Sequence, residues 1–222
     1  MKRKVIETED GSTTILMEDW GESFHSIHGA IQEAQHVYIQ NGLRFAFENV
    51  STNLNVLEIG FGTGLNCFLT LLDAHILNAS VNYHGVEGFP LKENEWKALN
   101  YHTFFDKEYS FNFEDLHQSE WGREIAINEV FSLTKHELMF EDLNFNSQFD
   151  LVYFDAFGYQ YQPELWSKEI LLKVKKALKP NGILVTYACK GVVNRTLKEL
   201  GFKIEKLEGP PGKREMTRAV LI

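Results

Sequence analysis

The sequence has few cysteines and no long apolar segment, and both absences narrow the class of protein. Its two cysteines, Cys67 and Cys189, lie far apart inside apolar stretches, which favours buried thiols in a reducing compartment over a disulfide framework. No stretch approaches the roughly 18 uncharged apolar residues of a membrane-spanning helix. The polar, charged start over residues 1–11 lacks the apolar core of a secretory signal. We therefore expect a cytoplasmic protein without a membrane anchor.

A recognisable metal-ligand pattern is also missing. His25, His28 and His36 lie near one another along the chain, but no fourth ligand joins them at a standard spacing. We expect no metal site.

Basic residues are scarce in most of the chain, which carries a net charge of -9. Residues 1–165 hold 9 Lys and Arg against 26 Asp and Glu, whereas residues 166–222 hold 13 against 5. A basic C-terminal quarter on an acidic body is typical of a locally basic, RNA-facing surface. The lysines of a helix expected over 164–179 can equally form an ordinary solvated face.

Glycine is concentrated in one informative motif, Glu58-x-Gly60-x-Gly62-x-Gly64. It follows an apolar run and precedes another, which predicts a strand, a glycine-rich turn and a helix. Such a turn lets a ligand lie against bare backbone at a helix N-terminus. A dinucleotide fingerprint needs its third glycine where this chain has Leu65, so a nicotinamide oxidoreductase is disfavoured. The spacing is instead typical of S-adenosylmethionine (SAM) methyltransferases.

Strands and helices alternate after the glycine motif. Apolar periodicity predicts strands over 55–60, 82–87, 135–140, 149–154, 183–188, 202–207 and 216–222, and helices over 64–76, 91–101, 164–178 and 191–200. This alternation favours an α/β fold with a mostly parallel sheet, and the short connection between the last two strands predicts an antiparallel hairpin. We expect a Rossmann-like, class I SAM-dependent methyltransferase with a seven-stranded sheet.

Two segments stand outside the alternation. Residues 1–50 are expected to form an N-terminal extension, with helical content around 30–41, that packs on a methyltransferase domain over 51–222. The aromatic and acidic segment 102–132 is expected to be an inserted cap over the active-site side.

Acidic residues end four of the predicted strands, at the sheet edge where ligands of open parallel sheets bind. We expect Glu87 to accept the ribose hydroxyls of SAM, Asp142 to accept its adenine amino group, and Glu58 to face its methionine ammonium side. Asp155 is expected near the methyl group, as the catalytic residue. The full set of expected cofactor-binding residues is Glu58, Gly60, Phe61, Gly62, Thr63, Gly64, Asn66, Glu87, Gly88, Asp142, Leu143 and Asp155.

Aromatic and basic residues near this edge are candidates for substrate contacts. Phe157 and Tyr159 follow Asp155 and can stack on a flipped base, although they can equally pack in a lid. The candidates for contacts with tRNA phosphates are Lys190, Arg195, Lys213 and Arg214.

Three stretches together resemble the methyltransferase domain of the MnmC family: Ile59 to Asn66, Asp155-Ala156-Phe157 with Pro163 to Trp166, and Gly212 to Met216. The resemblance covers roughly residues 20–222. It implies methylation of the aminomethyl group of 5-aminomethyl-(2-thio)uridine at the tRNA wobble position, with SAM as donor and the anticodon region as partner. In that family the domain is often fused to a flavin-dependent oxidase. No room remains for that domain here, so we expect a stand-alone methyltransferase without flavin.

Two other functions remain open. The same fold can methylate a small-molecule or protein amine, and the acidic body suits a cationic substrate. A SAM-binding RNA protein without turnover is a further alternative, against which the intact Asp155 argues.

Overall fold

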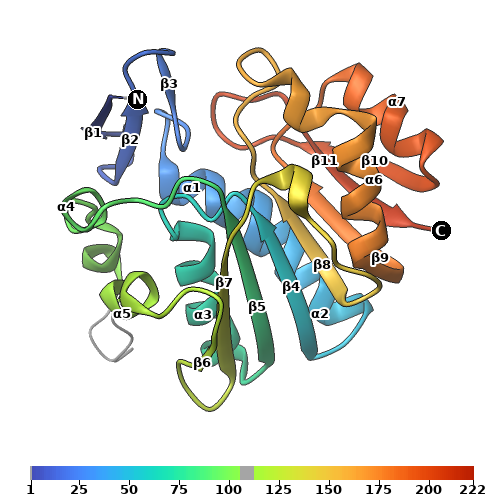
Figure 1. The fold of residues 1–222 in the computed structure, drawn as a ribbon, viewed down its shortest axis with the longest axis horizontal. Coiled ribbons are helices and arrows are strands. Elements are labelled where there is room, and N and C mark those ends of the chain that lie inside the picture. The colour runs from blue at the N-terminus through green and yellow to red at the C-terminus, as the bar shows by residue number, and fades with distance from the viewer. Residues whose placement is uncertain (1, 106–112) are drawn as a thin grey trace.

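The computed structural model describes residues 2–105 and 113–222, and its centre is an eight-stranded sheet with helices on both faces (Figure 1). Across the sheet the order is β10 (Phe202–Glu208), β11 (Glu215–Leu221), β9 (Leu178–Thr186), β8 (Phe149–Phe154), β4 (Asn53–Ile59), β5 (Ser80–Glu87), β7 (Phe131–Glu137) and β6 (Glu124–Ala126). The strands from β9 to β7 are parallel, and β11 lies antiparallel between β9 and β10. The predicted Rossmann-like fold with its C-terminal antiparallel hairpin is confirmed.

Side chains of the central strands are buried on both faces, which is why these strands read as continuous apolar runs. In β8, Leu151 and Tyr153 pack in one core cluster, whereas Val152 and Phe154 pack in the other. The first cluster is covered by α1 (Ala30–Ala34), η1 (Gln35–Arg44), α2 (Phe45–Asn49) and α3 (Leu65–Leu77). The second is covered by η4 (Pro163–Trp166), α6 (Lys168–Ala177) and α7 (Gly191–Glu199).

The sheet has one strand more than predicted, because β6 pairs antiparallel with the outer edge of β7. β7 itself begins and ends earlier than the predicted strand 135–140. As a result Glu141 and Asp142 do not end a strand but lie in η3 (Phe140–Asp142). Pairing with β5 sets this register, since Glu87 and Glu137 are the last partners of the two strands.

The predicted helix over 91–101 is reduced to α4 (Glu93–Trp96), followed by η2 (Tyr101–Phe104). The helix does not continue through Asn100, because the Asn100 side chain is hydrogen-bonded to the N-terminal extension. Its side chain accepts the Thr13 N–H (2.8 Å) and donates to the Gly11 carbonyl (3.0 Å). The segment thus ties the N-terminal extension to the main domain.

The N-terminal extension contains a small three-stranded antiparallel sheet that was not predicted, made of β1 (Arg3–Glu7), β2 (Thr13–Met17) and β3 (Glu22–Ser23). Figure 1 shows it apart from the main sheet and next to α4. The sequence does carry a signal for it, since β-branched residues flank the Asp10-Gly11 turn pair. The helical content expected around 30–41 is confirmed and extends to Asn49, with a π-helical middle section.

In the insertion 102–132, His117 and Trp121 contact the glycine loop (residues 60–64), and its expected role as a cap over the active-site side stays a prediction. Residues 106–112 are outside the described part. The insertion contains α5 (Phe113–Gln118), and none of its described residues lines the cavity at the carboxyl ends of β4, β5 and β8. Trp121 packs on Phe61 of the glycine loop at 6.1 Å between ring centroids. Within residues 2–105 and 113–222, no helix has the length and apolarity needed to cross a membrane.

Candidate functional site

A cavity of about 570 Å³ opens at the carboxyl ends of β4, β5 and β8, a size suited to a small-molecule ligand. Seven segments form its walls: the N-terminal extension, the glycine loop, the residues after β5, the turn after β7, the loop after β8, Tyr187 after β9 and Lys213 in the loop between β10 and β11. Of the predicted site residues, the lining includes Gly60, Phe61, Gly62, Thr63, Glu87, Gly88, Asp155, Phe157 and Lys213.

The glycine loop needs its glycines for conformation and for space. Gly60, Gly62 and Gly64 have φ values of 94°, 49° and 72°, a region that other residues rarely adopt. A Cβ on Gly60 would lie 2.5 Å from the Asp155 carbonyl oxygen. Gly64 does not line the cavity but serves as the N-cap of α3. The loop therefore brings bare backbone against the end of β8.

Glu87 is held in place by the backbone around it. Its Oε2 accepts the Gly62 N–H and its Oε1 accepts the Phe89 N–H, both at 2.9 Å. Each carboxylate oxygen keeps a second lone pair. The side chain thus lines the cavity with acceptor capacity for a ligand hydroxyl, in line with its predicted role at the ribose.

Asp155 is joined to a deeper carboxyl group through one amide. The Asn66 side-chain nitrogen donates to Asp155 Oδ2 (2.8 Å) and to Glu58 Oε1 (2.9 Å). Glu58 is only 1% exposed and does not reach the cavity, contrary to the prediction that it faces the methionine ammonium. Asn66 is equally buried. These two residues support Asp155 from behind and do not line the cavity.

Burial raises the pKa of Asp155 to about 7, and nearby groups adjust it. The buried Tyr38 hydroxyl lies beside the carboxylate, outside hydrogen-bond geometry, and favours the ionised form, as do the Asn66 amide and the Lys213 ammonium. The Glu33 charge opposes it. Burial also raises the pKa of Glu58 well above its ordinary value, so the deeper carboxyl favours the neutral form. Asp155 is therefore the group of this pair that titrates near neutral pH.

Lys213 points into the cavity and is not free to meet an RNA backbone, as its loop position had suggested. It forms an ion pair with the buried Glu33, and its ammonium lies 4.2 Å from the centre of the Tyr187 ring. Glu33 in turn accepts the Ser26 N–H (2.8 Å). The ion pair closes the loop between β10 and β11 onto the N-terminal extension.

Aromatic rings from two segments meet beside Asp155. Phe157 packs edge-to-face on Trp20 (5.4 Å) and on Phe24 (5.1 Å) of the N-terminal extension. Tyr159 does not line the cavity; its ring lies 5.0 Å from the Lys190 ammonium. The sequence prediction missed Trp20, Glu22, Phe24, Met139 and Phe140 as lining residues, since none belongs to a motif with assigned chemistry.

Other predicted residues lie outside the lining. Asp142 is exposed on η3, two residues beyond the lining residue Phe140, and Leu143 is buried in the second core cluster. The roles assigned to Asp142 and Leu143 stay predictions.

The three histidines considered for metal binding have separate partners: Thr63 for His25, Glu9 for His28 and the Glu208 carbonyl for His36. Within the described residues, no group of three or more His, Cys, Asp or Glu side chains is placed to hold a metal ion.

Comparison with known proteins identifies the family of this chain. The family model described as S-adenosyl-L-methionine-dependent methyltransferase matches residues 98–222, more than half of the chain. The chain belongs to this methyltransferase family. SAM is accordingly its cofactor, as the glycine motif predicted.

The predicted resemblance to the MnmC methyltransferase domain is also confirmed. A relative from Leptospira interrogans is 29% identical over 220 residues, covering 94% of this chain and 34% of the relative. One from Campylobacter fetus is 32% identical over 174 residues, covering 75% of this chain and 28% of the relative. Both are named tRNA 5-methylaminomethyl-2-thiouridine biosynthesis bifunctional protein MnmC. The chain thus spans about a third of the length of these relatives.

A solved structure agrees with these relatives. MNMC2 from Aquifex aeolicus is 27% identical to this chain, with a TM-score of 0.80, and the match covers 100% of this chain and 70% of that chain.

The residues of the cavity fit SAM. The backbone of Gly60 and Gly62 lines the cavity, and Glu87 offers two preset acceptors beside it. Apolar side chains of Phe89, Met139 and Phe140 flank the same region. Glu87 with the glycine loop would hold the nucleoside part of the cofactor, which supplies an electrophilic methyl group when bound.

Asp155→Asn should separate cofactor binding from turnover. The substitution keeps the shape of the side chain but removes the group that can accept a proton, so we expect methyl transfer to fall by about 10²-fold or more. Binding of S-adenosylhomocysteine (SAH), measured by calorimetry, should stay within a few-fold of the wild type. Asp150→Asn is a matched control, because Asp150 pairs with Lys179 at the other end of the same strand. Full turnover by Asp155→Asn would remove Asp155 from the mechanism.

Proposed function

We propose that this chain transfers a methyl group from SAM to the aminomethyl group of 5-aminomethyl-(2-thio)uridine at the wobble position of tRNA. The observation that carries the proposal is Asp155, a carboxylate with a pKa of about 7 beside the glycine loop and the rings of Phe157 and Phe24. The names of the MnmC relatives support the substrate.

Asp155 would act on the acceptor amine. An alkyl amine is mostly protonated near pH 7, because its pKa resembles the value of about 10.4 for a lysine side chain. An ionised Asp155 would orient the ammonium and take its proton, which leaves the lone pair free to attack. The new N–C bond forms as the S–C bond breaks, and SAH leaves with the electron pair on sulfur. Asn66 would hold the carboxylate in its orientation during this step.

The aromatic wall would position the base. Phe157 with Trp20 and Phe24 can pack against a flipped uracil ring and exclude water from the reacting atoms. Positioning of this kind can contribute roughly 7–11 kcal/mol to the lowering of a barrier.

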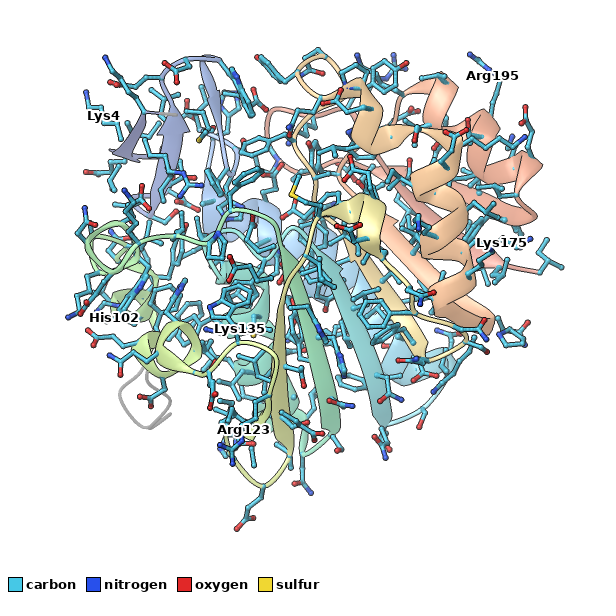
Figure 2. The ribbon with its side chains drawn as sticks, viewed as in Figure 1. Lys4, His102, Arg123, Lys135, Lys175 and Arg195 are labelled. Atoms are coloured by element: carbon cyan, nitrogen blue, oxygen red, sulfur yellow. The ribbon has the colours of Figure 1, made fainter. Side chains whose placement is uncertain are left out.

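Exposed cations in the C-terminal part of the chain would contact the RNA backbone. Lys190, Arg195 and Arg214 are exposed, and Figure 2 shows Arg195 projecting from α7 into solvent. In the part of the chain that the structure describes, these three side chains form no ion pair, whereas Lys168, Lys179 and Lys206 each pair with a carboxylate. The unpaired cations are therefore better candidates for phosphate contacts than Lys213.

The substrate is tested by methyl transfer from labelled SAM to tRNA from cells that lack this protein, followed by nucleoside mass analysis. We expect aminomethyl uridine to gain the mass of one methyl group. SAH binding without methylation of tRNA would contradict the proposed substrate and would favour a small-molecule or protein amine, which the acidic side chains Glu22, Glu33 and Asp155 of the cavity also suit.

The pH profile of kcat/KM should show an acid limb near pH 7. Burial raises the pKa of Asp155 to about 7, so the required carboxylate is lost as the pH falls through that value. Lys213→Met removes a positive charge that lowers the pKa of Asp155, and the limb should move to higher pH. Arg214→Met, at the exposed neighbour, is the control and should leave the limb in place. A limb that does not move with Lys213→Met would mean that another group titrates.

The salt dependence of tRNA binding should show whether Lys190, Arg195 and Arg214 contact tRNA phosphates. Each phosphate contact contributes about one unit to the slope of log K against log salt concentration. The triple variant Lys190→Ala, Arg195→Ala, Arg214→Ala should therefore bind more weakly, with a slope smaller by up to about three units. Arg123→Ala, far from Arg195 at the opposite end of the sheet in Figure 2, should leave the slope unchanged. An unaltered slope in the triple variant would place RNA binding on another surface.

A further inference from the structure

Thr63, in the glycine loop, is held from two sides by histidines. The Thr63 side chain is buried, and its hydroxyl lies 2.5 Å from His25 Nε2. The carbonyl of the same residue accepts a hydrogen bond from His117 Nε2 at 3.0 Å. His25 follows β3 in the N-terminal extension, and His117 lies in α5 of the insertion. The two segments that stand outside the strand–helix alternation therefore both hold the glycine loop.

Each histidine is itself fixed. The His117 ring stacks on Trp96 at 5.1 Å with planes 5° apart, and the carbonyl of His117 accepts a hydrogen bond from the buried Lys135 (2.6 Å). Lys135, on β7, is only 1% exposed. Its place is labelled in Figure 2. The His25 backbone N–H bonds to the Thr14 hydroxyl (3.1 Å) of β2. The His25 ring also packs edge-to-face on the Tyr101 ring, with 6.3 Å between centroids.

The protonation state suits a permanent contact. Burial lowers the pKa of both His25 and His117 to about 4, so both rings are neutral at pH 7. Since a carbonyl only accepts, His117 must carry its proton on Nε2. A loop that its own protein already holds in the binding shape loses less conformational entropy when a ligand binds.

We propose that His25 and His117 are positioning residues that hold Thr63, and with it the glycine loop, in the shape that binds SAM. Neither histidine needs to touch the reacting atoms for this role. The inference rests on the SAM site alone and does not depend on the identity of the methyl acceptor.

The test is a set of SAH affinities measured by calorimetry on folded variants. His25→Phe, Thr63→Val and His117→Phe each remove one partner of a hydrogen bond while keeping similar shape, and each should bind SAH roughly fivefold to tenfold more weakly. His117→Gln, whose amide N–H can replace the lost donor, should recover affinity to within about twofold of the wild type. His36→Phe is the control and should bind like the wild type, because His36 bonds to the Glu208 carbonyl away from the loop.

Combined variants distinguish positioning from a general loss of stability. His25→Phe and Thr63→Val remove the same contact, so the double variant should bind SAH no more weakly than either single variant. His117→Phe acts through the backbone carbonyl, and its effect should persist in the Thr63→Val background. Wild-type SAH affinity in His25→Phe and His117→Phe, or additive effects of His25→Phe and Thr63→Val, would overturn the proposal. Thermal unfolding of each variant confirms that it is folded before its affinity is compared.

Discussion

The burial of the Asp155 carboxyl group is the constraint on which the rest of the site depends. A charged group withdrawn from water is costly unless polar neighbours compensate, and here the compensation is partial. Asn66 donates one hydrogen bond, the Tyr38 hydroxyl lies close by, and Lys213 supplies a positive charge. The carboxyl group is left with a pKa of about 7, at which a small change in surroundings changes its charge. A pKa in this range suits a group that must receive a proton near neutral pH.

The neighbours of Asp155 come from distant parts of the chain, so the site exists only when the whole fold is assembled. Tyr38 belongs to the π-helical section near the N-terminus, Asn66 to the helix after the glycine loop, and Lys213 to the last hairpin. The Glu33–Lys213 ion pair joins the N-terminal extension to that hairpin. The extension is thus a wall of the cavity as well as a covering of the sheet, because Trp20 and Phe24 pack on Phe157.

Prediction from the sequence worked best where the local pattern dictates the structure. The glycine spacing led to a turn with three positive φ angles, and β8 has the predicted bounds because its six residues are buried on both faces. Prediction was less accurate where contacts with distant residues set the bounds of a helix or strand. The register of β7 against β5 moved the strand end away from Glu141, and the contacts of Asn100 with β2 shortened a helix that looked amphipathic.

The sequence by itself determined the fold class, the cofactor motif and the position of Asp155 at a strand end, since these follow from apolar periodicity and glycine chemistry within short windows. Tertiary structure decided which polar groups face the cavity. Glu58 is turned inward onto Asn66, and Lys213 is drawn inward by Glu33, although both had been expected to meet a ligand directly. Side-chain direction at such positions depends on partners more than a hundred residues away, as for Glu33 and Lys213, or on a buried amide, and no local pattern encodes either.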